Sequence, residues 1–183
     1  PRKNIELALN TLAMLRRDFP RAALVVTGPE GPHNPENAVY KQKLLTLRDA
    51  LGLKNAAHFL AEYTTEFLSD ALIADFFHLA DALLFPSREE GFGIPLIEAA
   101  IARLPIFCTN ITPLRDLGES DVSFFSPDAD PAKVAQLIVT RLNSDAAFCF
   151  ASRVKRSYTW ETVYTASIAP LLETAFLYKN EEV

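Results

Sequence analysis

Cysteine is scarce in this chain of 183 residues, and its two copies lie far apart. Cys108 stands in PIFCTN and Cys149 in AAFCFA, each among apolar neighbours. Neither has the paired spacing of a zinc knuckle. We therefore expect two buried free thiols, in preference to a disulfide, and a reducing cytoplasmic compartment.

Clusters of basic residues and long uncharged apolar runs are also missing. The chain has 18 Lys and Arg against 23 Asp and Glu, a net charge of −5. A surface that binds nucleic acid needs a clustered basic face, so no nucleic-acid partner is expected. Asp75, His78 and Asp81 interrupt the apolar run at 72–85. We therefore find neither a membrane span nor a signal peptide.

The residues that are present predict strands alternating with helices. Hydrophobic residues make up 49% of the chain, enough for a real core. This alternation predicts a doubly wound parallel α/β sheet of the Rossmann-like kind, in one domain without an interior linker. Strands are expected at 22–28, 56–61, 81–87, 104–109 and 122–126. Helices are expected at 4–18, 36–51, 67–80, 131–142, 145–157 and 160–178, with a short one near 113–117.

The segment FPSREEGFGIPLIEAA follows the end of a predicted strand, where open α/β sheets bind ligands. Gly91 and Gly93 allow the backbone to approach a ligand closely. Pro95 suits the first turn of a helix. The free amides at that helix start form an anion site, which predicts a bound phosphate or diphosphate.

Two carboxylates flank this turn, Glu90 in the loop and Glu98 eight positions later. Carboxylates accept hydrogen bonds from vicinal hydroxyls, as an acidic residue does with ribose in dinucleotide folds. An anion with hydroxyls at each end describes a nucleotide-diphospho-sugar. Glutamates at this spacing also arise by chance, and Glu98 is equally explained as a solvated helix residue.

PSREEGFGIPLIEAA resembles the donor-site motif of the retaining glycosyltransferases of family 4, in which two glutamates flank a Gly-Phe-Gly turn. The resemblance continues in order through KNIELALNTLAML, AALVVTGP, HFLAEY, LADALLFPS and SFFSPDADPAKVAQLI. It implies the GT-B fold of two Rossmann-like lobes. Residues 1–183 are then expected to be the carboxyl-terminal, donor-binding lobe of a longer enzyme.

The resemblance also implies residue roles. Glu98 would bind the donor ribose, and Glu90 would lie beside the transferred sugar. Lys3 would neutralise the leaving diphosphate, a role consistent with charge stabilisation. The turn residues would hold the sugar and diphosphate: Gly91, Phe92, Gly93 and Ile94.

Three features depart from the family pattern or imitate another one. The family has an arginine at the end of a strand a few residues before the lysine, so Arg2 is an uncertain match. That strand is expected to lie upstream of Pro1. Leu104 replaces the usual glycine behind the donor helix. Asp128–Asp130 imitates a metal-binding acid pair, but Asp130 is better placed to cap the next helix, so we expect no metal and no cofactor.

The three histidines are not expected to be catalytic. His33 stands in a proline-rich loop and is interpreted as a surface residue. His58 and His78 lie in apolar segments and are expected to be structural.

The resemblance predicts a hexosyltransferase that moves mannose or glucose from a nucleotide donor with retained configuration. The acceptor is expected to bind in the amino-terminal lobe, which also provides any peripheral membrane contact. The isolated chain would bind the donor but transfer almost nothing. One alternative is a non-catalytic nucleotide-sugar-binding module. A nicotinamide dehydrogenase is disfavoured because no glycine fingerprint follows a first strand.

Overall fold

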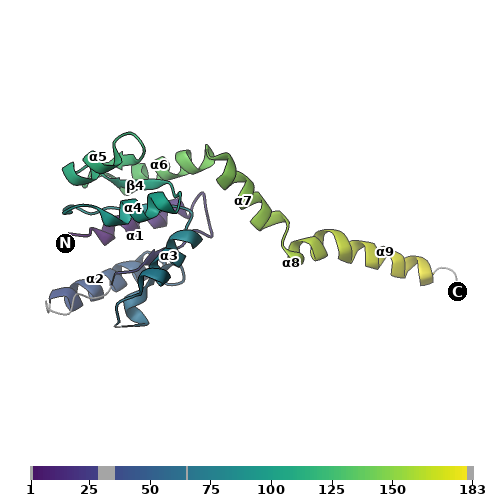
Figure 1. Cartoon of the computed structure of the whole chain (residues 1–183). Coiled ribbons are helices and arrows are strands. Elements are labelled where there is room, and N and C mark those ends of the chain that lie inside the picture. Colours follow the sequence, from purple (N-terminus) through teal and green to yellow (C-terminus); the bar gives the residue numbers. More distant parts are fainter. Residues whose placement is uncertain (1, 29–35, 65, 181–183) are drawn as a thin grey trace. The chain divides into compact units, whose positions relative to one another are not determined.

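The computed structural model describes residues 2–28, 36–64 and 66–180 and divides the chain into two compact units, 1–140 and 141–183 (Figure 1). His33 lies outside the described residues. No helix in the described part of the chain is long and apolar enough to cross a membrane.

All strands of the first unit that pair within the described residues run parallel. β1 (Leu24–Val26) pairs with β2 (Ala57–Phe59), and Leu24 lies opposite Ala57. β4 (Ile106–Thr109) lies between β3 (Leu83–Phe85) and β5 (Ser123–Phe125). The predicted parallel α/β fold is confirmed, and every expected strand contains an observed one.

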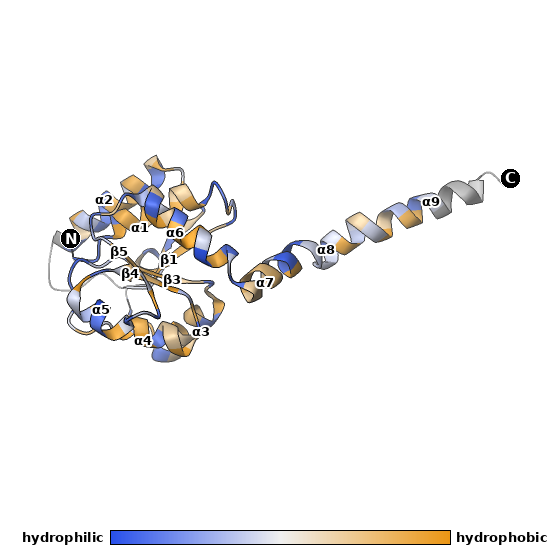
Figure 2. Ribbon diagram, turned by 90° about the horizontal axis from the view of Figure 1, so that it is seen from above, coloured by the Kyte–Doolittle hydropathy of each residue, from blue (hydrophilic) through white to orange (hydrophobic). Residues whose placement is uncertain are grey.

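Helices cover both faces of these strands, as Figure 2 shows. One layer contains α1 (Ile5–Leu15), α2 (Glu36–Ala50) and the first part of α6 (Pro131–Asn143). The opposite layer contains α3 (Asp70–Leu79), α4 (Ile94–Ile101) and α5 (Thr112–Gly118). A 3₁₀ turn, Leu60–Glu62, follows β2. This is the doubly wound arrangement, in which crossover helices pack on both sides of a parallel sheet.

Burial differs between the strands in a way that their pattern alone does not predict. β4 is fully buried, and its Cys108 thiol has its pKa raised to about 12 by burial. In contrast, β1 and β3 are only partly buried, and Val25 is 41% exposed. Within the described residues, β1 and β3 each pair on one edge only. We call the unpaired edges of β1 and β3 the seam.

Residues 146–180 of the second unit are helical except for a bend at Tyr158 and Thr159. This unit contains α7 (Ala146–Ser157), α8 (Trp160–Val163), a π-helical segment (Tyr164–Ile168) and α9 (Ala169–Asn180). Asp145 caps α7 by accepting a hydrogen bond from the Phe148 N–H at 2.9 Å. The prediction of a buried Cys149 is wrong, because this thiol is exposed on α7.

Candidate functional site

The start of the chain is attached to the carboxyl edge of the strands by backbone and side-chain hydrogen bonds. The carbonyl of Arg2 accepts a bond from the N–H of Arg88, in the loop after β3, at 2.8 Å. The Asn4 side chain donates to the Pro127 carbonyl, in the loop after β5, at 3.1 Å. These bonds place Lys3 beside the glycine turn, although 87 positions separate it from Glu90.

Lys3 and Glu90 form an ion pair in which the lysine ammonium donates to the carboxylate. The Lys3 side chain is 43% exposed and the Glu90 side chain only 10%. The ammonium also lies 5.2 Å from the centre of the Phe85 ring, a cation–π distance. A desolvated carboxylate needs a compensating charge, which Lys3 supplies. Because nearly half of the Lys3 side chain stays in solvent, its charge remains accessible to an anion.

The turn after Glu90 depends on glycine at one position. Gly93 has a φ of 96°, in the left-handed region, and precedes α4 directly. A Cβ on Gly93 would lie 2.7 Å from Leu114 Cδ2 on α5. Pro95 occupies the first turn of α4, as predicted. This tight turn leaves the amides at the start of α4 at the carboxyl edge, where they suit a phosphate group.

Glu98 lies in a different hollow from the turn. It is half-buried and lines a groove of about 180 Å³ between α3 and α4. Neither Glu90 nor the Gly-Phe-Gly turn contributes to that groove. The other lining residues are Asp70, Ile73, Ala74, Phe77, His78, Ile101 and Ala102. The structure therefore brings Lys3 to Glu90 and places Glu98 in a separate, partly apolar groove.

Sequence reasoning missed the α3 side of this groove. Asp70, Ala74 and His78 are spaced by four residues, which puts them on one helical face. The sequence shows this spacing, but it does not show that α4 packs against this face of α3. His78, expected to be structural, lines the groove that contains Glu98.

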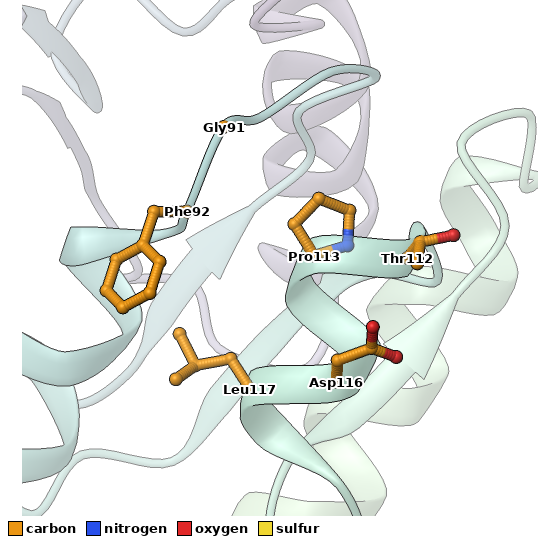
Figure 3. Close-up of a pocket in the computed structure, with 6 residues that line it drawn as sticks. All are labelled: Gly91, Phe92, Thr112, Pro113, Asp116 and Leu117. Carbon is orange, nitrogen blue, oxygen red and sulfur yellow. The ribbon is translucent and has the colours of Figure 1, made fainter.

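A second pocket, of about 410 Å³, lies between the turn and α5 (Figure 3). Gly91 and Phe92 form one wall, and residues of α5 form the other: Thr112, Pro113, Asp116 and Leu117. Phe92 was expected in the site, but the α5 residues were not. Only the strand order could have indicated the α5 residues. The turn follows β3 and α5 follows the neighbouring strand, β4, so both lie at the same edge of the sheet.

The two aspartates of segment 128–130 form an ion pair and a helix-capping hydrogen bond. Asp128 pairs with Arg88 at 2.6 Å, and the Asp130 carboxylate accepts a bond from the Ala132 N–H at 2.8 Å. The predicted capping role of Asp130 is confirmed. No group of three or more potential metal-binding side chains occurs in the described part of the chain.

The model of the family "Glycosyl transferases group 1" matches residues 1–153. Glycogen synthase from Mycobacterium tuberculosis is 31% identical over 173 residues, which cover 90% of this chain and 38% of that protein. The serotype-specific mannosyltransferase WbdA of Escherichia coli is 35% identical over 71 residues, which cover 39% of this chain and 9% of WbdA. The chain thus spans less than half the length of these relatives.

Solved structures support the same fold at low sequence identity. The C-terminal domain of the group 1 glycosyl transferase LpcC from Francisella tularensis gives a TM-score of 0.65 at 18% identity, with 90% of this chain and 79% of that chain covered. Anabaena HepE in complex with UDP and glucose gives a TM-score of 0.54 at 18% identity and covers 92% of this chain and 55% of that chain. With a family match over more than half of its length, the chain belongs to the group 1 glycosyl transferases.

Proposed function

We propose that this chain is the donor-binding, carboxyl-terminal lobe of a retaining glycosyltransferase of family 4, which transfers mannose or glucose from a nucleotide-diphospho-sugar. The observation that carries the proposal is the ion pair of Lys3 with Glu90 beside the amides that begin α4. A cation next to a helix N-terminus is an environment for a diphosphate. The nearly buried Glu90 carboxylate lies beside this cation, where it can accept a hydrogen bond from a sugar hydroxyl.

The nucleoside and the sugar, at the two ends of a nucleotide-sugar, match the groove of Glu98 and the carboxylate of Glu90. The groove of Glu98 offers a carboxylate for ribose hydroxyls and an apolar wall, from Ile73 and Phe77, for a nucleoside. Glu98 lies on α4, five residues after Gly93. A nucleoside bound at Glu98 therefore leaves its diphosphate near the start of α4. The sugar then extends towards Glu90. The backbone carbonyl of Arg2 accepts the hydrogen bond from the Arg88 N–H. The Arg2 side chain is exposed and is available for the diphosphate.

The relatives support a hexose donor. Their names include mannosyltransferases and a glycogen synthase, and the HepE complex contains UDP and glucose. Mannose and glucose are therefore the sugars we propose for this chain. We place the acceptor chiefly on another lobe, and we expect the 183-residue chain alone to bind the donor without appreciable transfer.

Glu98→Ala is expected to remove nucleotide-sugar binding. The wild-type chain and the variant are compared by thermal unfolding with GDP-mannose, UDP-glucose, ADP-glucose and NAD. A ligand at about a hundred times its dissociation constant stabilises by about 2.7 kcal/mol, a shift of roughly 5–10 °C for a chain of this size. One nucleotide-sugar should give this shift in the wild-type chain and little in the variant.

Glu173→Ala is the matched control, because Glu173 is an exposed glutamate within α9. It should keep the full ligand shift. A shift with NAD alone, or with no nucleotide-sugar, would contradict the proposed donor site.

We also propose that a further parallel strand, contributed by the polypeptide upstream of Arg2, lies in the seam between β1 and β3. Two observations support this strand: the unpaired edges that β1 and β3 present within the described residues, and the Arg2–Arg88 backbone bond at the end of β3. A strand that ended at Arg2 would reach the carboxyl edge beside β3. It would cover apolar side chains such as Val25, now 41% exposed.

An upstream extension by the native sequence is expected to protect the seam. Hydrogen exchange should slow by roughly tenfold or more at the seam-facing amides of β1 and β3, because edge amides would become paired. Exchange in β5, on the far side of β4, should change much less. An extension of equal length made of Gly and Ser is the control, and equal protection by both extensions would refute the strand.

A further inference from the structure

The pocket beside α5 is separate from the carboxylate that the proposed donor site uses. Glu90 pairs with Lys3, whereas the next two residues, Gly91 and Phe92, form a wall of the pocket. Glu90 itself does not line it. The turn therefore contributes Glu90 to the ion pair and its next two residues to a second pocket, of about 410 Å³.

The walls of this pocket are held together by close packing. Gly93 approaches Leu114 so closely that an added Cβ would lie 2.7 Å from the leucine side chain. Leu114 is fully buried and belongs to the core cluster that contains Leu96 and Cys108. The turn and α5 thus share one core, so their facing side chains form a preorganised wall.

The pocket has an apolar end and a polar end. Figure 3 shows Phe92 near Leu117 at one end, with Thr112 and Asp116 at the other. Phe92 is 61% exposed, so much of its ring is open to a ligand. Arg115 contacts both polar residues weakly, at 3.4 Å from Thr112 Oγ1 and 3.8 Å from Asp116 Oδ1. Both polar groups therefore stay available to a ligand.

This combination is the chemistry that binds a neutral pyranose ring. A pyranose presents a face of C–H groups, which packs on an aromatic ring, and a rim of hydroxyls, which donate to a carboxylate and exchange bonds with a hydroxyl. An anionic ligand is disfavoured because Asp116 supplies the charged group of the lining, and it is negative. Pockets with apolar walls and a few convergent polar groups are typical small-molecule sites.

We propose that the pocket between the Gly91–Phe92 turn and α5 binds a sugar ring of the acceptor, next to the donor sugar at Glu90. This inference rests on the proposed function, since it places the second substrate beside the first. The donor sugar is assigned to Glu90, and the lining of the pocket begins with the next residue, Gly91. The acceptor lobe would then share its substrate with Phe92 and Asp116 of this chain.

Amide NMR titration of the 183-residue chain with methyl α-D-mannopyranoside and with methyl α-D-glucopyranoside tests the proposal. At least one glycoside should shift the amides of Gly91, Phe92, Thr112 and Asp116 in a saturable way. Phe92→Ala should weaken this binding by roughly threefold to tenfold, the range of an aromatic contact. Asp116→Asn keeps the shape and should weaken it by roughly twofold to fivefold, since a charged acceptor becomes neutral.

Phe67→Ala and Asp121→Asn are the matched controls, since both residues are exposed and neither lines the pocket. They should leave the glycoside affinity unchanged. Glycerol, a polyol without a ring face, should produce no saturable shift at these amides. Absence of saturable shifts, or equal weakening by the controls, would overturn the proposal.

A parallel titration with the nucleotide-sugars separates this inference from the proposed function. Phe92→Ala and Asp116→Asn should change glycoside binding more than nucleotide binding, because the nucleoside is assigned to the Glu98 groove and the diphosphate to Lys3 and the start of α4. Nucleotide binding that Glu98→Ala removes, without any glycoside binding, would refute the acceptor pocket alone. If no nucleotide-sugar binds, the donor site fails, and glycoside shifts that survive would still establish a sugar pocket.

Discussion

Gly93→Ala is expected to destabilise the chain by about 1–3 kcal/mol, the cost of a side chain in a left-handed backbone position. The φ of Gly93 is 96°, and the new Cβ would meet Leu114 at 2.7 Å. Leu114 is fully buried, so it has little room to move away. The turn must then shift, and with it the amides that begin α4. We expect urea unfolding to show the lost stability and nucleotide-sugar binding to fall in the same variant.

Gly91→Ala provides the control within the same turn. A Cβ at Gly91 meets nothing within 4 Å, and its φ lies outside the left-handed region. This variant should keep its unfolding midpoint within about 0.5 kcal/mol, the usual range for a surface substitution. Equal stability of the Gly93→Ala and wild-type chains would show that the turn relaxes freely, which contradicts the packing argument.

The local part of the site could be predicted because its causes are local. Pro95 and Gly93 mark the start of α4 through their own backbone preferences. Asp130 caps α6 through an N–H two residues ahead. The order of strands and helices followed from hydrophobic periodicity, and a chain that alternates in this way has few alternatives to a parallel sheet. The resemblance to family 4 then suggested which of these residues face a ligand.

The long-range part of the site could not be predicted from these residues. Glu98 could have faced solvent, and only the packing of α3 against α4 places it in a groove with Asp70 and His78. Asp116 became a pocket residue because β4 lies beside β3, which brings α5 to the turn. Such contacts between separate helices and loops cannot be predicted from residues that are neighbours in the sequence.

The wrong expectation for Cys149 has the same origin. Its apolar neighbours suggested burial, but hydrophobic neighbours show only that a segment has an apolar face. They do not show that another element covers that face. Phe150, the next residue, is likewise exposed at 59%.

Lys3→Met is expected to weaken the binding of free GDP, UDP or ADP, whichever the chain prefers, by roughly 10-fold to 100-fold. A hydrogen bond to a charged group contributes about 1.5–3 kcal/mol, and this lysine is the charged partner we assign to the diphosphate. The affinity should also become less sensitive to salt, since one ionic contact is lost. Isothermal titration at two salt concentrations measures both effects. Lys54→Met, a change at an exposed lysine in the turn after α2, should alter neither.

The loss of Lys3 also leaves the nearly buried Glu90 carboxylate without its partner, so the variant should lose stability as well as affinity. The double variant Lys3→Met with Glu90→Gln separates these effects. The neutral amide no longer needs a cation, so stability should recover while nucleotide affinity stays low. Glu90→Gln alone frees the ammonium from its carboxylate, so it should bind the free nucleoside diphosphate at least as tightly as the wild-type chain. If nucleotide affinity instead recovers with stability in the double variant, Lys3 acts only through its pair with Glu90, and the diphosphate must be held by the α4 amides and Arg2.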